Sequence, residues 1–107
     1  IEVNRNVSIG GGAKNEGWLR MQANIFNAEI VQLSNEQGPG MGAAMLAALG
    51  CGWFDSLEQC REQFIQYTKT YRPNPATVEK YAELFKIYKQ VYPQTKPLND
   101  ELVSFRP

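Results

Sequence analysis

The stretch SIGGGAKNEGW, residues 8–18, is the part of the chain around which the rest is arranged. β-branched Val3, Val7 and Ile9 are typical of a strand, and three consecutive glycines, residues 10–12, come directly after them. Without a Cβ, the main chain at residues 10–12 can adopt positive φ or approach a ligand closely. Asn15 is a favourable helix N-cap, and apolar residues recur after it at helical spacing. We expect a strand, a glycine turn and a helix whose first N–H groups suit the phosphate or sugar of a nucleotide.

The glycine turn matches neither of the two common nucleotide-binding fingerprints. Asn15 stands where GxGxxG would have its third glycine, and no GK[ST] follows. The local sequence therefore leaves two interpretations of the turn open. The turn is a ligand site, or it is a tight turn where a helix and a strand pack closely.

The composition predicts one small, ordered globular unit. The 107 residues, 43% of them hydrophobic, are enough for a single core. Eleven basic residues balance eleven acidic ones and are scattered, so we expect neither a nucleic-acid nor a membrane surface. The longest apolar stretch, residues 41–49, is too short to span a bilayer, and we find no signal peptide, so we expect a cytoplasmic protein. Because the sequence opens on Ile1 just before a strand, we expect Ile1 not to be a natural N-terminus.

The chemically active side chains are few. There is no histidine, which excludes Ser–His and Cys–His catalysis within these residues. Cys51 and Cys60 are nine residues apart, which fits no zinc pattern. We expect two reduced, partly buried thiols, with a disulfide as the less favoured alternative, and no catalytic or metal-binding residue in the chain.

Three charged residues lie near the two glycine-containing loops, at 10–12 and 34–40, which should face a ligand crevice at the carboxyl ends of the strands. Glu16 and Glu36 could each touch a ribose or an adenine amino group, although a solvated or helix-capping role is the simpler reading. Lys14 would favour a phosphate, but an exposed lysine is common at a helix start.

The pattern along the first half of the chain predicts a βαβ unit. We expect a helix at 15–27 and a second strand at 28–33, parallel to the first and next to it. A loop at 34–40 then leads to a helix at 41–50 built almost wholly of small residues, which we expect to pack closely in the centre of the domain.

The pattern along the second half of the chain predicts mainly helices. Ser56 should cap a helix that runs to about residue 67, followed by a short strand or extended arm at 68–72. Pro75 should open a last helix that Pro93 ends, leaving a tail without pattern from residue 96. One apolar stripe of that helix predicts core positions: Val78, Tyr81, Ala82, Phe85, Tyr88 and Tyr92.

The predicted sheet is incomplete. Two firm strands and a doubtful third, against about four helices, leave sheet edges and apolar faces uncovered. We therefore expect part of a larger α/β domain, with a glycine-motif core at 1–55 and a helical end at 56–107. The exposed edge also predicts a homo-oligomer, a dimer or larger.

Two long stretches carry a family resemblance. GGGAKNEGWLRMQANIFNAEIV, followed by GPGMGAAMLAALGCGWFDSLEQ, resembles the C-terminal end of carbohydrate kinases of the FGGY family. The order GGGAKS-x-x-W, Q-x-A-D/N, a new strand and G-x-G-A-A makes it most similar to the xylulokinases of that family. The likeness covers residues 7–92, and the order and spacing of the two glycine motifs make it specific.

The resemblance implies part of an actin-like, ribonuclease-H-like ATPase domain that binds ATP at the glycine motif. Gly11, Gly12 and Ala13 would approach the nucleotide, with Asn15 or Glu16 near the adenine or ribose. The helix that includes Gly42 would pack behind the adenosine pocket. The resemblance further implies phosphoryl transfer from ATP to D-xylulose with Mg²⁺. The catalytic aspartate, the metal ligands and most of the sugar pocket would lie outside these residues.

Other functions remain open at this point. A kinase of the same family could act on gluconate, ribulose, fuculose or glycerol, because the sugar-contacting residues are not in the chain. A non-catalytic nucleotide-binding or interaction module is a second possibility. A glycine turn that binds nothing is the third.

Overall fold

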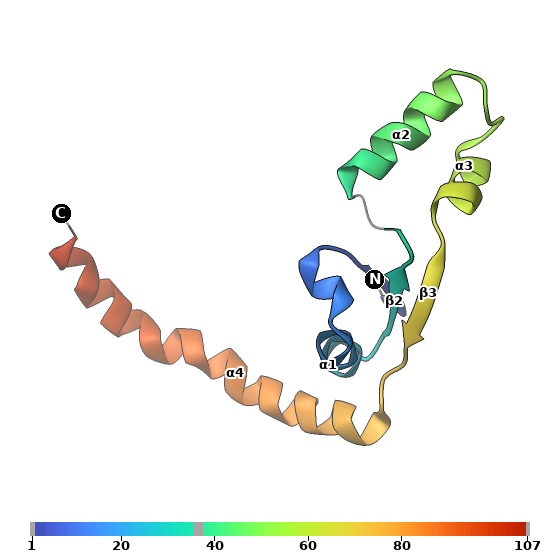
Figure 1. Cartoon of the computed structure of the whole chain (residues 1–107). Helices are drawn as coiled ribbons and strands as arrows, with labels where there is room; N and C mark the ends of the chain where they lie inside the picture. Colours follow the sequence, from blue (N-terminus) through green and yellow to red (C-terminus); the bar gives the residue numbers. More distant parts are fainter. Residues whose placement is uncertain (1, 36–37, 107) are drawn as a thin grey trace.

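The computed structural model describes residues 2–35 and 38–106. A small sheet lies beside α1, the pair α2 and α3 lies beyond one end of it, and α4 leads away from it (Figure 1). In chain order the elements are β1 (Arg5–Ser8), the 3-10 turn η1 (Gly11–Lys14), α1 (Glu16–Phe26), β2 (Glu29–Leu33), α2 (Pro39–Gly50), α3 (Leu57–Phe64), β3 (Tyr67–Tyr71), α4 (Pro75–Leu102) and a second 3-10 turn, η2 (Val103–Phe105).

The sheet has the order β1-β2-β3, with β1 and β2 parallel and β3 antiparallel to β2. The parallel pair joined by α1 confirms the predicted βαβ unit. The open choice at 68–72 is settled as a strand. The predicted end of the preceding helix near residue 67 is wrong, because α3 stops at Phe64. The Gln66 carbonyl accepts a hydrogen bond from the Ser34 N–H at 2.8 Å. The chain is therefore already paired next to the end of β2 at residue 66, and the helix cannot continue for another turn.

The core lies between α1 and the sheet. Leu19 and Ala23 of α1 pack with Ile30 of β2 and Tyr71 of β3, and all four are buried. Asn15 caps α1 as predicted, since its Oδ1 accepts a hydrogen bond from the Trp18 N–H at 3.0 Å. This contact between helix and sheet fixes where the glycine turn sits, because the turn joins β1 directly to α1.

The small-residue helix α2 packs on α3, away from the sheet (Figure 1). Met45 and Ala48 are its buried residues, and the Met45 carbonyl lies 3.8 Å from the Sγ of buried Cys60. Cys51 at the end of α2 is exposed and Cys60 is fully buried, so the expectation that both thiols are partly buried is wrong. The two cysteines are free in the structure. Leu46 is 63% exposed, so α2 does not occupy the centre of a domain within this chain.

The long helix α4 contradicts two expectations about the end of the chain. Pro93 does not end the helix, and the predicted tail from residue 96 is helical to Leu102. Proline removes one backbone hydrogen bond, but polar side chains bridge this part of the helix. Gln94 bonds Gln90 at 3.2 Å, and the Thr95 hydroxyl donates to the Val91 carbonyl at 2.8 Å.

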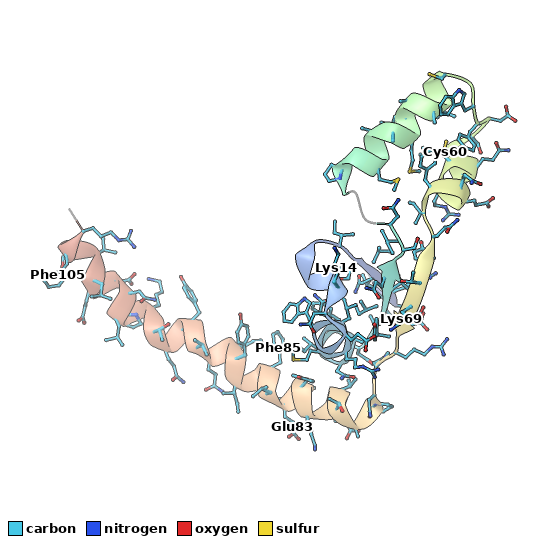
Figure 2. The ribbon with its side chains drawn as sticks, viewed as in Figure 1. Lys14, Cys60, Lys69, Glu83, Phe85 and Phe105 are labelled. Carbon is cyan, nitrogen blue, oxygen red and sulfur yellow. The ribbon has the colours of Figure 1, made fainter. Side chains whose placement is uncertain are left out.

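The apolar stripe of α4 is not a core within this chain. No residue of α4 is buried, and Phe85, Tyr88 and Tyr92 are each more than half exposed. Phe85 and Glu83 leave α4 on opposite sides, and Phe105 lies at the far end of the arm (Figure 2). The Cα radius of gyration is 20.0 Å, against about 13 Å for a compact domain of this length. Periodicity identified an apolar face, and among the described residues nothing buries it at Phe85, Tyr88 or Tyr92.

Candidate functional site

The glycine turn begins where β1 ends and closes into one turn of 3-10 helix. Gly10 has φ +88°, a conformation that side-chain-bearing residues rarely adopt. The Ala13 N–H bonds the Gly10 carbonyl at 2.9 Å, and the Ala13 side chain is buried. The turn is therefore anchored at Ala13 while its glycines face outward.

Two features leave Gly11 accessible to a ligand. A Cβ placed on Gly10 or Gly11 would meet no atom within 4 Å in the structure. Within the part of the chain that is described, the N–H groups of Gly11 and Gly12 donate no hydrogen bond. Adjacent main-chain donors without a chain partner are the groups that bind phosphate or hydroxyl oxygens at such turns.

Gly12 has a different environment. A Cβ there would lie 3.2 Å from the indole of Trp18, so this side of the turn is already occupied by the protein's own side chain. The indole also borders a shallow depression lined by Gly12, Asn15, Gly17, Trp18 and Met21. Gly12 thus allows close packing on one side, whereas Gly11 has open space.

Glu16 forms an ion pair with Lys69 of β3. The Lys69 ammonium, by hydrogen bond and charge, lowers the pKa of Glu16, and Glu16 in turn raises the pKa of Lys69. The stability due to Glu16 is lost only as pH falls through its lowered pKa, and that due to Lys69 only as pH rises through its raised pKa. The pair therefore persists between the ordinary values of 4.5 and 10.5. Both side chains are more than half exposed, so its contribution to stability is small.

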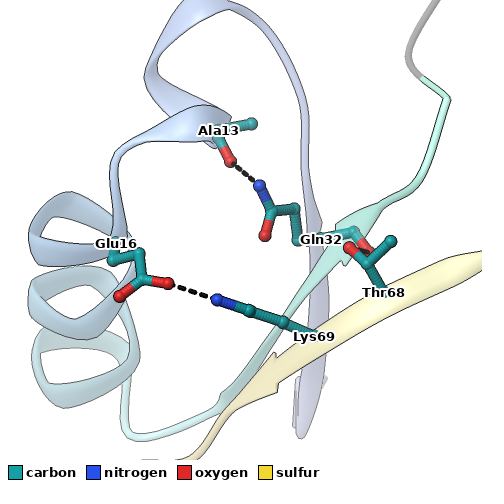
Figure 3. A network of polar contacts seen from close by, with 5 residues as sticks. All are labelled: Ala13, Glu16, Gln32, Thr68 and Lys69. Carbon is teal, nitrogen blue, oxygen red and sulfur yellow. Dashed lines mark hydrogen bonds and ion pairs between the residues drawn. The ribbon is translucent and has the colours of Figure 1, made fainter.

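Figure 3 shows the polar contacts that join the sheet to the turn. The Gln32 Nε2 of β2 donates a hydrogen bond to the Ala13 carbonyl at 2.9 Å. The Thr68 hydroxyl of β3 donates to the Gln32 carbonyl at 3.3 Å, and Lys69 reaches Glu16. Strands β2 and β3 thus contact both the end of the turn and the start of α1.

The sequence reasoning overlooked Gln32 and Lys69. Strand alternation places Gln32 on the same face as buried Ile30, which is the α1 side of the sheet. A polar residue on an apolar face was therefore the available signal for Gln32. No comparable signal existed for Lys69, because its contact with Glu16 spans 53 positions and depends on the antiparallel pairing of β3.

The remaining candidates are less informative. Lys14 is exposed and is the last residue of η1, the 3-10 part of the glycine turn (Figure 2). Glu36 lies outside the described residues. Within residues 2–35 and 38–106, no group of three or more His, Cys, Asp or Glu side chains could hold a metal ion. The same residues contain no helix that combines the length and the apolarity needed to cross a membrane.

A larger hollow lies along the outer side of β1. Its lining mixes apolar side chains with polar ones: Val3, Val7, Ile9, Phe26 and Ile30 with Asn6, Ser8 and Gln22. Because β1 is the edge of the described sheet, this hollow lies beside an unpaired strand edge.

Comparisons with known proteins identify the family in which this strand, turn and helix occur. Residues 1–51 match the family model "FGGY family of carbohydrate kinases, C-terminal domain". The xylulose kinase of Bacillus subtilis is 59% identical over 104 residues, 97% of this chain and 21% of that protein. The chain belongs to the FGGY family of carbohydrate kinases.

The structural comparisons agree with the FGGY assignment. The ligand-bound xylulose kinase of Lactobacillus acidophilus matches with a TM-score of 0.79 and 30% identity, over 86% of this chain and 19% of that one. The gluconate kinase of Lactobacillus acidophilus matches with a TM-score of 0.78 and 31% identity, over 85% and 18%. The predicted fold, part of an actin-like, ribonuclease-H-like α/β domain, is confirmed. The chain spans about a fifth of the length of the curated FGGY relatives it matches.

Proposed function

We propose that this chain is the C-terminal nucleotide-binding segment of a xylulokinase, which transfers the γ-phosphoryl group of ATP to D-xylulose. The observation that carries the proposal is the exposed glycine turn of an FGGY kinase segment, in which the N–H groups of Gly11 and Gly12 have no acceptor among the described residues. The identity of 59% to a xylulose kinase supports the choice of sugar.

The residues of the turn fit the nucleotide. Gly11 and Gly12 would donate main-chain hydrogen bonds to it, and the open space at Gly11 would admit it without steric conflict. Asn15 and Glu16, at the start of α1, would lie toward the adenine or ribose. Because Glu16 is already paired with Lys69, its charge would repel the phosphates less than a free carboxylate would.

The reactive groups would come from elsewhere in the longer polypeptide. Phosphoryl transfer requires a positioned carboxylate and Mg²⁺ to neutralise the developing charge. No cluster of metal ligands exists among the described residues, so the metal, the catalytic aspartate and most sugar contacts would lie outside this segment. What this chain supplies is binding and orientation of the nucleotide. The proposal includes a cytoplasmic location and one C-terminal domain of which residues 1–107 are a part.

The test is ADP release by the full-length protein with ATP, Mg²⁺ and a panel of sugars. We expect turnover with D-xylulose, and none from the 107-residue chain alone, because its described residues hold no group of side chains that could bind the metal ion. D-xylulose-dependent ADP release by the isolated chain, or a full-length protein that does not bind ADP, would contradict the proposal.

A second sugar has a specific observation behind it. The gluconate kinase of Lactobacillus acidophilus matches this chain as well as the xylulose kinase from the same organism does, with TM-scores of 0.78 and 0.79. The nucleotide-binding fold is thus shared between kinases of different sugars. Gluconate should be included in the panel, and preferential turnover of gluconate would replace D-xylulose in the proposal.

The isolated chain should self-associate. The outer edge of β1 is unpaired within the described sheet, and α4 exposes aromatic side chains along its length. We expect a dimer or larger species, because pairing of edges and apolar faces would remove this surface from water. Light scattering at high concentration measures the mass, and a monomer would contradict the expectation.

A further inference from the structure

We infer that Gln32 is a positioning residue for the nucleotide-binding turn, holding the Ala13 carbonyl so that the N–H groups of Gly11 and Gly12 face the ligand. The inference rests on the proposed function, because it assigns a role to Gln32 in the binding of that same nucleotide. Gln32 itself lies on β2 and is placed to act through Ala13 (Figure 3).

The geometry supports a positioning role for Gln32, because its side chain binds the glycine turn near the point where the turn leads into α1. The Ala13 N–H already bonds Gly10, and the Gln32 amide bonds the Ala13 carbonyl, so both sides of this residue are fixed. The Ala13 carbonyl belongs to the peptide that ends the turn, so losing the Gln32 bond would free this end of the turn from β2. The whole turn, including the amides of Gly11 and Gly12, could then shift relative to the sheet. Positional accuracy of such donors is what a preorganised binding site requires.

The contact is also better protected than the ion pair beside it. The Gln32 bond is partly buried, whereas Lys69 and Glu16 are more than half exposed. Water competes for exposed polar groups, so the ion pair restrains the turn weakly. The Thr68 hydroxyl bonds the Gln32 main-chain carbonyl and leaves the side-chain amide unchanged.

The experiment uses the full-length protein and titrates ADP by calorimetry. Gln32→Leu removes the amide donor, and we expect the Kd for ADP to rise about three- to tenfold, the size of one lost neutral hydrogen bond. KM for ATP should rise with it, while KM for the sugar stays unchanged. Gln32→Glu keeps the shape but places a carboxylate against the Ala13 carbonyl, so its loss should be larger. Thr68→Val is the matched control, with a change below about twofold.

The outcomes separate this inference from the proposed function. A wild-type protein that does not bind ADP overturns the proposed function. A wild-type protein that binds ADP, with Gln32→Leu and Gln32→Glu binding equally well, overturns the positioning role alone. Equal rises in KM for ATP and for the sugar, together with a lower melting temperature, would also overturn it, because a general structural defect affects both substrates. If Gln32→Leu does not fold, Gln32→Glu carries the same comparison.

Discussion

Replacing Gly11 with valine is expected to weaken ADP binding by the full-length protein at least about tenfold, or about 1.4 kcal/mol, without lowering its stability. A Cβ at Gly11 meets no atom within 4 Å in the free protein, and its φ lies outside the positive range that disfavours side chains. The added methyl groups would therefore cost little on folding. They would occupy the space in which we place the nucleotide.

Gly12→Ala provides the matched comparison in the same turn. Its Cβ would lie 3.2 Å from the Trp18 indole, so the ring must shift by a few tenths of an ångström. Overpacking costs about 1–3 kcal/mol, and we expect the low end because Trp18 is 46% exposed and can move. Gly12→Ala should thus lower the melting temperature, whereas Gly11→Val should not.

Calorimetric titration of ADP and thermal unfolding of both variants test the assignment. Unchanged affinity in Gly11→Val would show that the nucleotide does not approach the turn on its open side. Loss of affinity together with loss of stability would indicate a folding defect, and the ligand-site reading would then fail at Gly11.

Local signals predicted the first third of the fold well. Three glycines, the Asn15 cap and the alternation in β2 are short-range features, and each has the predicted structure. The path of the chain after residue 64 was less predictable. The antiparallel pairing that ends α3 early depends on Ser34, some thirty positions away, and no local pattern encodes it.

The error at Pro93 has a different cause. Proline is a reliable helix terminator where its lost hydrogen bond leaves a buried carbonyl unpaired. Along α4 every residue is at least partly exposed, so water can reach that carbonyl and Thr95 bonds the turn before it. The candidate site shows the same limit, since the glycine motif was visible in the sequence while Gln32 and Lys69 required the sheet register.

Replacing Leu19 with alanine is expected to loosen the packing that supports the glycine turn. Leu19 of α1 is fully buried against Ile30 and Tyr71 of the sheet. The cavity that alanine would leave there should lower the stability by about 2–5 kcal/mol. Hydrogen exchange of the β2 amides in the full-length protein measures this loss of stability locally. A local measurement is needed because the global unfolding of a large protein is not two-state. The opening free energy of the β2 amides should fall by that amount.

Leu98→Ala is the control, because it removes the same atoms from a side chain that is 61% exposed near the end of α4. Leucine and alanine are both good helix formers, so this change should leave the β2 amides unaffected. A loss below about 1 kcal/mol in Leu19→Ala would mean that α1 does not rely on this contact. The turn would then have to be held by its polar contacts, and the Gln32 variants would show a larger effect on ADP binding than the single hydrogen bond predicts.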